Sequence, residues 1–245
     1  MSSFIIRLSD VNFRWRGQDH LTLDIPRFEV APKERLFIHG PSGSGKTTLL
    51  NLLAGVSVPE SGIVEVLDQN IAALSNAGRD GFRSDHIGLI FQMFNLVPYL
   101  SLIENVLLPC RFSNRRRKRA LADDGDLESA AARLLSEMGL GDHRLQQRTV
   151  ANLSVGQQQR VAVARALIGE PELITADEPT SSLDADAQRS FLQLLFDEVN
   201  KAGSTLLFVS HDRHMEDQFD RTIALSEINR VANSDPGGQT EGQTA

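Results

Sequence analysis

The segment GPSGSGKTT at residues 40–48 constrains the fold of this 245-residue chain more than any other stretch. It fits the pattern G-x-x-x-x-G-K-[ST] and lies between a short apolar run at 35–39 and a helical pattern at 47–56. Its glycines let the backbone turn so that several N–H groups converge on one point, and the dipole of the following helix adds positive charge there. A strand, this loop and a helix therefore predict an α/β fold with a phosphate-binding site.

Within this loop two side chains have a predicted chemical role. Lys46 would neutralise the β- and γ-phosphates of a nucleotide, and the Thr47 hydroxyl would bind Mg²⁺. The predicted nucleotide-binding residues of the loop are Gly40, Pro41, Ser42, Gly43, Ser44, Gly45, Lys46, Thr47 and Thr48.

Apolar runs that alternate with helical patterns predict a mainly parallel sheet. Strands are expected at 11–15, 35–39, 63–67, 87–91, 173–177 and 206–210, and helices at 47–56, 101–108, 127–138 and 185–201. The middle third, about 93–152, is rich in helical patterns and is interpreted as a helical subdomain inserted in one domain that spans 1–233. The polar residues at 234–245 are expected to form a disordered tail.

Two carboxylates stand at the end of the apolar run 173–177. Asp177 suits a Mg²⁺ contact, and Glu178 is placed to polarise a water for attack on the γ-phosphate. The alternative is an exposed acidic turn before Pro179. His211 follows the run 206–209 and is predicted to lie at the same sheet edge, where it would hold the γ-phosphate and orient Glu178. The other five histidines are interpreted as structural.

A helix start is predicted at 154–157, because Ser154 and Gln157 form the Ser-x-x-Gln capping box before an apolar run. This box alone does not explain why the helix begins with Val155, Gly156 and three consecutive glutamines.

Composition excludes several other classes of protein. The net charge of −7 argues against general affinity for nucleic acid, and the single Cys110 excludes an internal disulfide or a cysteine-based zinc site. No signal peptide is expected at the N-terminus. No apolar run reaches the roughly 18 residues of a membrane span, so a membrane path would have to come from another chain.

These motifs occur in the order found in ATP-binding-cassette (ABC) ATPases, which the sequence resembles over about residues 4–228. The resemblance implies a P-loop NTPase (RecA-like) core with an N-terminal antiparallel β subdomain and an inserted helical subdomain. It adds Gln92, the Q-loop glutamine, as a catalytic residue and as a metal ligand beside Thr47 and Asp177. The implied cofactors are ATP and Mg²⁺. Trp15 matches the adenine-stacking aromatic of the family, with Phe13 as the competing candidate and a core position for Trp15 as the alternative.

The resemblance also explains the helix start at residue 154. In the family, this signature helix of one subunit points at the γ-phosphate held by the phosphate loop of the other. The signature residues that would act in trans are Ser154, Val155, Gly156 and Gln157, and the D-loop residues are Ser182, Leu183 and Asp184. The chain would pair with a second ABC ATPase subunit, expected to be a copy of itself. Val155 replaces the usual first glycine of the signature, and we expect a helical backbone and a working site there.

The stretch 87–110 is similar to the lipoprotein-releasing, macrolide-efflux and FtsE-like group of ABC ATPases. That similarity implies an integral membrane permease that contacts the region from Gln92 to Tyr99, and a location at the cytoplasmic face of the inner membrane. Two other hypotheses are a soluble ABC ATPase that acts on nucleic acid or ribosomes, and a small-molecule kinase. The basic run 115–119 is interpreted as a solvated loop between helices, with a contact to anionic lipid or nucleic acid as alternatives.

Overall fold

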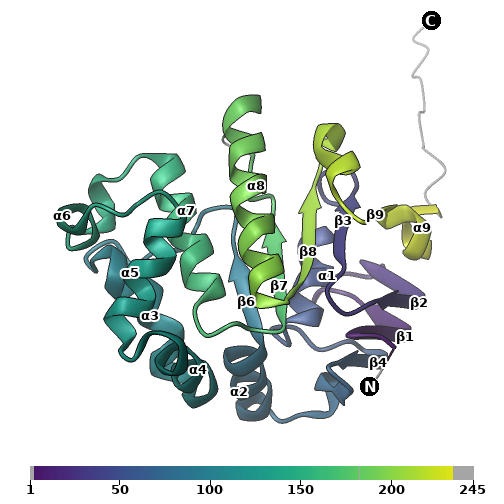
Figure 1. The fold of residues 1–245 in the computed structure, drawn as a ribbon. Coiled ribbons are helices and arrows are strands. Elements are labelled where there is room, and N and C mark those ends of the chain that lie inside the picture. Colours follow the sequence, from purple (N-terminus) through teal and green to yellow (C-terminus); the bar gives the residue numbers. More distant parts are fainter. Residues whose placement is uncertain (1–2, 182, 234–245) are drawn as a thin grey trace, which may run out of the picture.

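The computed structural model describes residues 3–181 and 183–233, which form two sheets and a helical region (Figure 1). The predicted tail at 234–245 lies outside the described residues. The strands are β1 (Ile6–Phe13), β2 (Leu23–Val30), β3 (Arg35–His39), β4 (Ser61–Val66), β5 (Gln69–Asn70), β6 (Ile87–Ile90), β7 (Leu173–Asp177), β8 (Thr205–Ser210) and β9 (Arg221–Ala224). The α-helices are α1 (Lys46–Leu53), α2 (Asn76–His86), α3 (Leu102–Phe112), α4 (Asn114–Asp124), α5 (Leu127–Glu137), α6 (His143–Gln146), α7 (Val155–Leu167), α8 (Ala185–Ala202) and α9 (Leu225–Ile228). Short 3₁₀ helices span Ile71–Ala73, Val150–Asn152, Arg213–Gln218 and Arg230–Asn233.

The larger sheet is parallel, with the strand order β6-β7-β8-β3-β9. Strands β3, β7 and β8 of this sheet are buried on both faces, so successive residues enter different cores. In β3, Phe37 faces the core under α3, α5, α7 and α8, whereas Leu36 and Ile38 face the core that contains α1. The predicted α/β fold with a mainly parallel sheet is therefore confirmed.

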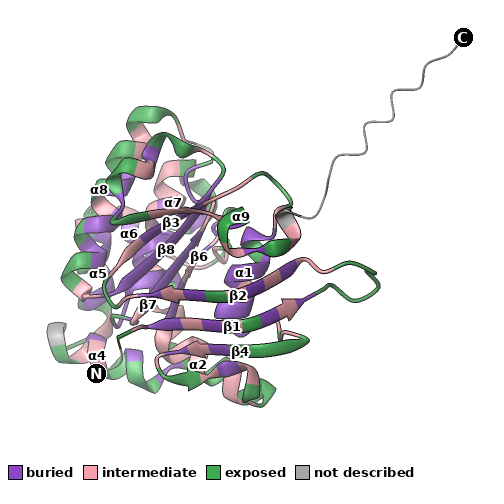
Figure 2. Cartoon of the chain, turned by 90° about the vertical axis from the view of Figure 1, so that its right-hand side faces the viewer, coloured by how far each residue is buried: buried purple, intermediate pink, exposed green. Residues whose placement is uncertain are grey.

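The smaller sheet is antiparallel, with the order β2-β1-β4-β5. Ile6 pairs with Val30 on one side and with Val66 on the other. Buried residues alternate with partly buried ones along β1 and β2 (Figure 2), and the buried ones cover α1. Period-two burial of this kind is typical of a sheet with one solvated face. This sheet is the predicted antiparallel subdomain, although β2 had no counterpart among the predicted strands.

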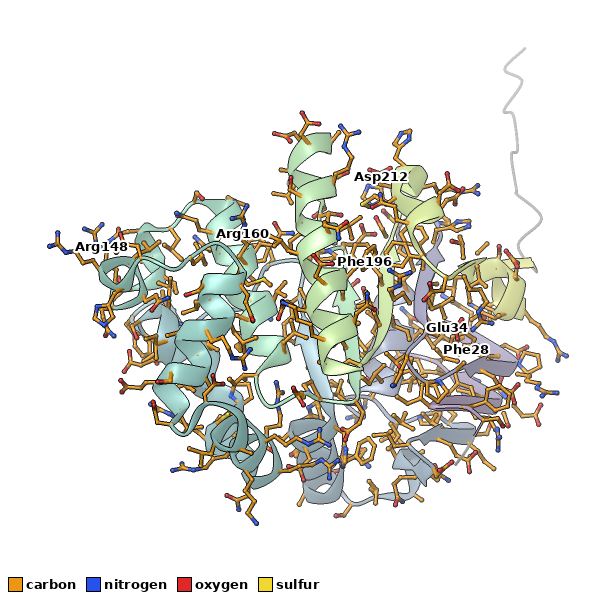
Figure 3. All side chains as sticks on the ribbon, viewed as in Figure 1. Phe28, Glu34, Arg148, Arg160, Phe196 and Asp212 are labelled. Carbon is orange, nitrogen blue, oxygen red and sulfur yellow. The ribbon has the colours of Figure 1, made fainter. Side chains whose placement is uncertain are left out.

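Helix α8 packs on the face of the parallel sheet opposite to α1, and its Phe196 lies in a cluster of aromatic side chains. The ring of Phe196 lies edge-on to Phe219 at 5.0 Å, and Phe219 lies 5.0 Å from Phe37 and 5.2 Å from Phe208. In Figure 3, Phe196 lies among the packed side chains, whereas Arg148 extends from the exposed outer end of the helical region. This packing fixes the carboxyl ends of β3 and β8, which carry parts of the site.

The basic run at 115–119 is not the predicted solvated loop but the first part of α4. Arg116 is buried and donates to the carbonyl oxygens of Ile168 (2.7 Å) and Ala166 (2.6 Å), which satisfies the last turn of α7. Burial lowers the pKa of Arg116 to about 10. Arg115 and Arg119 both contact the Glu172 carboxylate. Because three of these cations are used inside the fold, the prediction of a solvated loop is wrong.

Helix α7 lies so close to β6 that only glycine fits at position 88. A Cβ on Gly88 would lie 2.4 Å from the Ala166 carbonyl oxygen and 2.5 Å from Cδ1 of Ile174. Gly88→Ala is expected to lower the free energy of unfolding by about 2 kcal/mol, because either α7 or β7 must move. Gly81→Ala is the matched control, since a Cβ on Gly81 in α2 meets nothing within 4 Å. That control is expected to stabilise the protein by about 0.5 kcal/mol, and urea unfolding of both variants measures the difference. Equal stability of the two variants would contradict the close packing.

Candidate nucleotide-binding site

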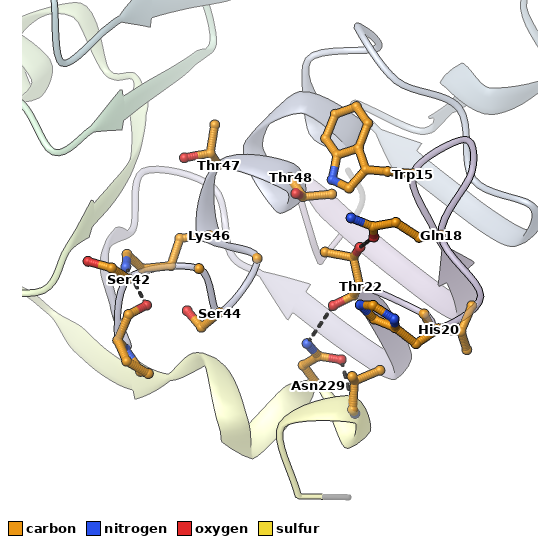
Figure 4. Close-up of a pocket in the computed structure, with 15 residues that line it drawn as sticks. Trp15, Gln18, His20, Thr22, Ser42, Ser44, Lys46, Thr47, Thr48 and Asn229 are labelled. Carbon is orange, nitrogen blue, oxygen red and sulfur yellow. Dashed lines mark hydrogen bonds between the residues drawn. The ribbon is translucent and has the colours of Figure 1, made fainter. Parts of the chain in front are cut away.

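The phosphate loop lines an open pocket of about 910 Å³ (Figure 4). The loop turns at Gly43 and Gly45, whose φ values of 79° and 104° favour glycine. Lys46 then begins α1, so the N-terminus of this helix opens into the pocket. The lining residues are Trp15, Gln18, His20, Leu21, Thr22, the loop residues 41–48, Asn229 and Val231. The fold therefore places the loop and the N-terminus of α1 around one concavity, as the motif predicts.

Lys46 is buried in the middle of the polar groups of the site. Its Nζ donates to the carbonyl oxygens of Gly40 (2.8 Å) and Pro41 (3.1 Å) and lies 3.5 Å from Oε1 of Glu178. The side chain of Lys46 is 7% exposed and that of Glu178 13% exposed, so this ion pair is only weakly screened by solvent. The Lys46 ammonium thus links the phosphate loop, which follows β3, to the Glu178 carboxylate, which follows β7.

Asp177 ends β7 and faces the start of α1. The Thr47 hydroxyl donates to Oδ2 of Asp177 at 2.8 Å. The other oxygen, Oδ1, is buried and has no hydrogen-bond partner in the described part of the chain. Oγ of Ser44 in the loop is likewise buried and has no such partner there. Burial raises the pKa of Asp177, and the Thr47 hydroxyl opposes that shift. A hydroxyl and an unpaired carboxylate oxygen are the donors that Mg²⁺ prefers, so these residues fit the implied ion.

Glu178 and His211 lie against one another at the ends of the adjacent strands β7 and β8. Nδ1 of His211 is 2.7 Å from Oε2 of Glu178, and the Ser210 hydroxyl donates to the same oxygen at 3.4 Å. The Glu178 backbone has a φ of 47°, and its N–H donates to the Val209 carbonyl at 2.9 Å. A non-glycine residue in this conformation is strained and persists only where its surroundings impose it. The exposed acidic turn considered as an alternative for these carboxylates is therefore wrong, because both side chains are built into the site.

Gln92 follows β6, the strand next to β7 in the sheet. Ile90 at the end of β6 pairs with Ala176, so Gln92 and Asp177 emerge at the same sheet edge. Gln92 itself is exposed in a turn. Farther along this segment Met93 and Tyr99 are 80% and 76% exposed, which is unusual for large apolar side chains.

Trp15 lines the pocket and is 41% exposed, whereas Phe13 is 6% exposed. The two rings contact edge to face at 5.0 Å. The alternative of a core position for Trp15 is therefore wrong, and Phe13 occupies the core instead.

Sequence reasoning missed the part of the pocket opposite the phosphate loop. His20, interpreted as structural, lines it, as do Gln18 and Thr22. Buried Asn229 donates from Nδ2 to the Thr22 carbonyl at 3.1 Å and accepts the Asp24 N–H at 2.9 Å. This amide fastens the C-terminal segment to the loop between β1 and β2 (Figure 4). Because Asn229 and Asp24 are 205 positions apart, no local sequence pattern predicts the contact.

The predicted capping box at the start of α7 is confirmed. The Gln157 N–H donates to Oγ of Ser154 at 3.3 Å, and the Ser154 N–H donates to Oε1 of Gln157 at 3.0 Å. Val155 is the first residue of α7, has no positive φ and is 49% exposed, so the expected helical backbone is confirmed. Ser154, Val155, Gly156 and Gln157 do not line the pocket of their own chain. Their helix lies against the face of the parallel sheet opposite to α1.

The predicted D-loop connects Glu178 to α8. Asp184 caps α8 by accepting the Ala187 N–H at 2.8 Å, and the Leu183 N–H donates to the Thr180 carbonyl at 3.1 Å. Gln188 also donates to the carbonyls of Thr180 and Leu183. Ser182 lies outside the described residues.

Within residues 3–181 and 183–233, no helix has the length and apolar character needed to cross a membrane.

Comparisons with known proteins agree with this geometry. Residues 23–181 match the ABC transporter family. The chain is 37% identical over 224 residues to an uncharacterized ABC transporter ATP-binding protein of Mycobacterium tuberculosis, covering 90% of this chain and 86% of the relative. It is 36% identical over 229 residues to the lipoprotein-releasing system ATP-binding protein LolD of Hydrogenovibrio crunogenus, covering 93% and 96%. A solved dimer of the ATP-binding cassette MJ0796, in a post-hydrolysis state with ADP and Pi, is 34% identical with a TM-score of 0.74, covering 89% of this chain and 93% of that one.

The phosphate loop, the two carboxylates after β7, the histidine after β8 and the capped signature helix occur here in one fold. The family match covers more than half of the chain, and the relatives align over most of both lengths. The chain belongs to the ABC transporter family and is one of its ATP-binding, ATP-hydrolysing subunits.

Proposed function

We propose that this chain pairs with a second copy and hydrolyses ATP·Mg²⁺ to drive a membrane permease of the lipoprotein-release type. The proposal rests on two direct contacts at one sheet edge. Lys46 pairs with Glu178, and the neighbouring Thr47 donates to Asp177. Backbone N–H groups of residues 42–48 and the Lys46 ammonium bind the phosphates, and Trp15 stacks on the adenine. His20 and Gln18 lie in the same pocket and contact the rest of the nucleoside.

Thr47, Asp177 and Gln92 are the residues that would hold the metal. When bound, Mg²⁺ neutralises charge on the β- and γ-phosphate oxygens. The unpartnered Oδ1 of Asp177 and the Thr47 hydroxyl support this assignment.

Glu178 serves as the general base. Its carboxylate accepts a hydrogen bond from the attacking water and takes up its proton as the water oxygen bonds to the γ-phosphorus, while the bond from that phosphorus to the β,γ-bridging oxygen breaks and ADP leaves. His211 fixes the orientation of Glu178 through their 2.7 Å contact and holds the γ-phosphate. The strained backbone of Glu178 keeps the carboxylate directed toward Lys46, where the phosphate chain begins.

Pairing follows from the position of the signature helix. Because α7 precedes β7 in a parallel crossover, its N-terminus and the phosphate loop open at the same edge but over opposite faces of the sheet. The chain carries one phosphate loop and one signature, so a complete site needs the signature of another subunit. Ser154 would offer its hydroxyl and Gly156 its N–H to the γ-phosphate bound by the partner, with Gln157 supporting the turn and Leu183 and Asp184 at the same contact. The solved dimer of MJ0796 supports such pairing.

Val155 is compatible with a working signature because it needs no positive φ. We expect Val155→Gly to change the kcat of ATP hydrolysis by less than about threefold, since the N–H groups stay in place and only the exposed side chain is lost. Steady-state phosphate release from the purified chain with its partner measures the effect. An inactive parent chain that gains activity with Val155→Gly would contradict this expectation.

The permease is proposed to contact the segment from Gln92 to Tyr99, where Met93 and Tyr99 are exposed. Aromatic residues and methionine are enriched at protein interfaces. Such a contact would hold the chain at the cytoplasmic face of the inner membrane. The relatives named for lipoprotein release support this class of permease.

An affinity pull-down of the tagged chain from gently solubilised membranes tests the proposal, with mass spectrometry to identify partners. A permease with few spans and a large external domain is expected to co-purify. Tyr99→Asp should lose this partner, whereas Ile63→Asp, a control at an exposed residue of β4, should retain it. Recovery of only soluble proteins or ribosomes would overturn the membrane function and favour the soluble ABC ATPase.

A further inference from the structure

Arg165, in the last turn of α7, binds two consecutive carbonyl groups of the turn that carries Gln92. Its Nη1 donates to the Asn95 carbonyl and its Nη2 to the Phe94 carbonyl, both at 2.6 Å. A planar guanidinium presents two parallel N–H donors to such a pair, and an ammonium does not. The contact joins residues 70 and 71 positions apart.

No carboxylate lies within ion-pair distance of Arg165 among residues 3–181 and 183–233. Burial lowers the pKa of Arg165 to about 10. A partly buried cation held by neutral carbonyls is unfavourable by itself. Charge neutralisation therefore does not account for its position, and the two hydrogen bonds to the turn do.

The turn that Arg165 binds has a strained backbone. Phe94 and Asn95 have φ values of 57° and 48°, two consecutive non-glycine residues in the left-handed region. Each such residue costs about 1–3 kcal/mol and persists only when its surroundings impose it. The side chain of Phe94 is buried, and Arg165 fixes both carbonyls. Gln92 is two residues before this pair, so the turn sets the direction in which Gln92 leaves β6.

We propose that Arg165 is a positioning residue for Gln92, which ties the turn at 92–95 to the helix that begins at the signature Ser154. The inference rests on the proposed function, in which Ser154 contacts the nucleotide of the partner subunit and Gln92 contacts the metal. A helix moves as one body, so displacement of its N-terminus by the partner's nucleotide moves the turn through Arg165. The nucleotide in one site thus controls the metal ligand in the other.

Hydrogen exchange on the nucleotide-free protein tests the structural part. Arg165→Lys keeps the charge but loses the paired donors, so amides at 91–97 are expected to exchange at least about tenfold faster. Arg160→Lys is the matched control, because Arg160 is a partly buried guanidinium of the same helix that donates to a different backbone carbonyl, that of Met138 at 3.3 Å. It is expected to loosen residues near 138–140 and leave 91–97 unchanged. Unchanged exchange at 91–97 in Arg165→Lys, or in Arg165→Gln if the lysine variant does not fold, would overturn the proposal.

A double-mutant cycle tests the functional part. Gln92→Ala and Arg165→Lys should each lower the kcat of ATP hydrolysis, and the double variant should be no slower than Gln92→Ala alone. Nucleotide binding without Mg²⁺ should be unchanged in all three. Effects that multiply would show that Arg165 acts independently of Gln92 and would overturn the proposal. A parent chain with no ATPase activity would contradict the proposed function instead, and the exchange measurement would then decide on Arg165 alone.

Discussion

Replacing Glu178 by glutamine is expected to lower the kcat of ATP hydrolysis by about a thousandfold while ATP remains bound. An amide has nearly the shape of the carboxylate but does not take up a proton from the attacking water. The glutamine amide also places an oxygen or nitrogen near Nδ1 of His211, which lies 2.7 Å from Oε2 of Glu178 in the parent chain. The geometry of the site is therefore retained. The ATP-bound closed dimer should therefore accumulate.

Gel filtration with and without ATP, alongside single-turnover hydrolysis, measures both effects of Glu178→Gln. The conservative control is Glu198→Gln, a buried glutamate of α8 that contacts Lys201 far from the pocket. That variant is expected to keep the parent rate. Absence of an ATP-dependent dimer of Glu178→Gln, alone or with the permease, would contradict the proposed mechanism.

Replacing Lys46 by alanine is expected to weaken ATP binding by at least about a hundredfold. The Lys46 ammonium is the buried cation of the phosphate loop, and loss of one partner from a buried, hydrogen-bonded charge pair costs about 3 kcal/mol. The variant also leaves Glu178, whose side chain is 13% exposed, without its 3.5 Å ion pair. The negative charge of the Glu178 carboxylate would then repel the phosphates of ATP.

Equilibrium binding of a fluorescent ATP analogue, with thermal unfolding as a check of folding, measures the Lys46→Ala effect. Lys33→Ala serves as a control, because Lys33 precedes β3 at the opposite end of the strand from the phosphate loop. Its affinity for ATP should equal that of the parent chain. Retained tight binding by a folded Lys46→Ala protein would show that the pocket does not bind phosphates as proposed.

The sequence predicted the elements whose signals are local. The strand at 35–39, the phosphate loop and the helix after it depend on glycine spacing and a short apolar run, and the structure has β3 and α1 there. The capping box at Ser154 and Gln157 is likewise a contact between residues three positions apart. The run 173–177 with its two carboxylates became β7, because a strand buried on both faces reads as continuously apolar.

Elements without such signals were missed. Helix α2 has no buried residue and begins with Asn76, so no apolar stripe marks it. In α4 the charged run 115–119 belongs to a helix in which Arg116 is buried beside Ala120, whereas composition alone would assign an arginine to the solvent-exposed surface. Strand β2 contains Pro26, and a proline argues against predicting a strand from sequence. Its burial pattern nevertheless matches that of β1.

By itself the sequence determined the chemistry of the site, because the phosphate loop, Asp177, Glu178 and His211 each lie at the end of an apolar run that must become a buried strand. Only the tertiary structure decided which of these ends meet. The order β6-β7-β8-β3-β9 places β8 between β7 and β3, so that His211 reaches Glu178 and Lys46 reaches the same carboxylate. The contacts of Asn229 with the β1–β2 loop and of Arg165 with the Gln92 turn join segments far apart in the chain. Such contacts depend on packing rather than on local pattern, and they place the pocket wall and the turn that carries Gln92.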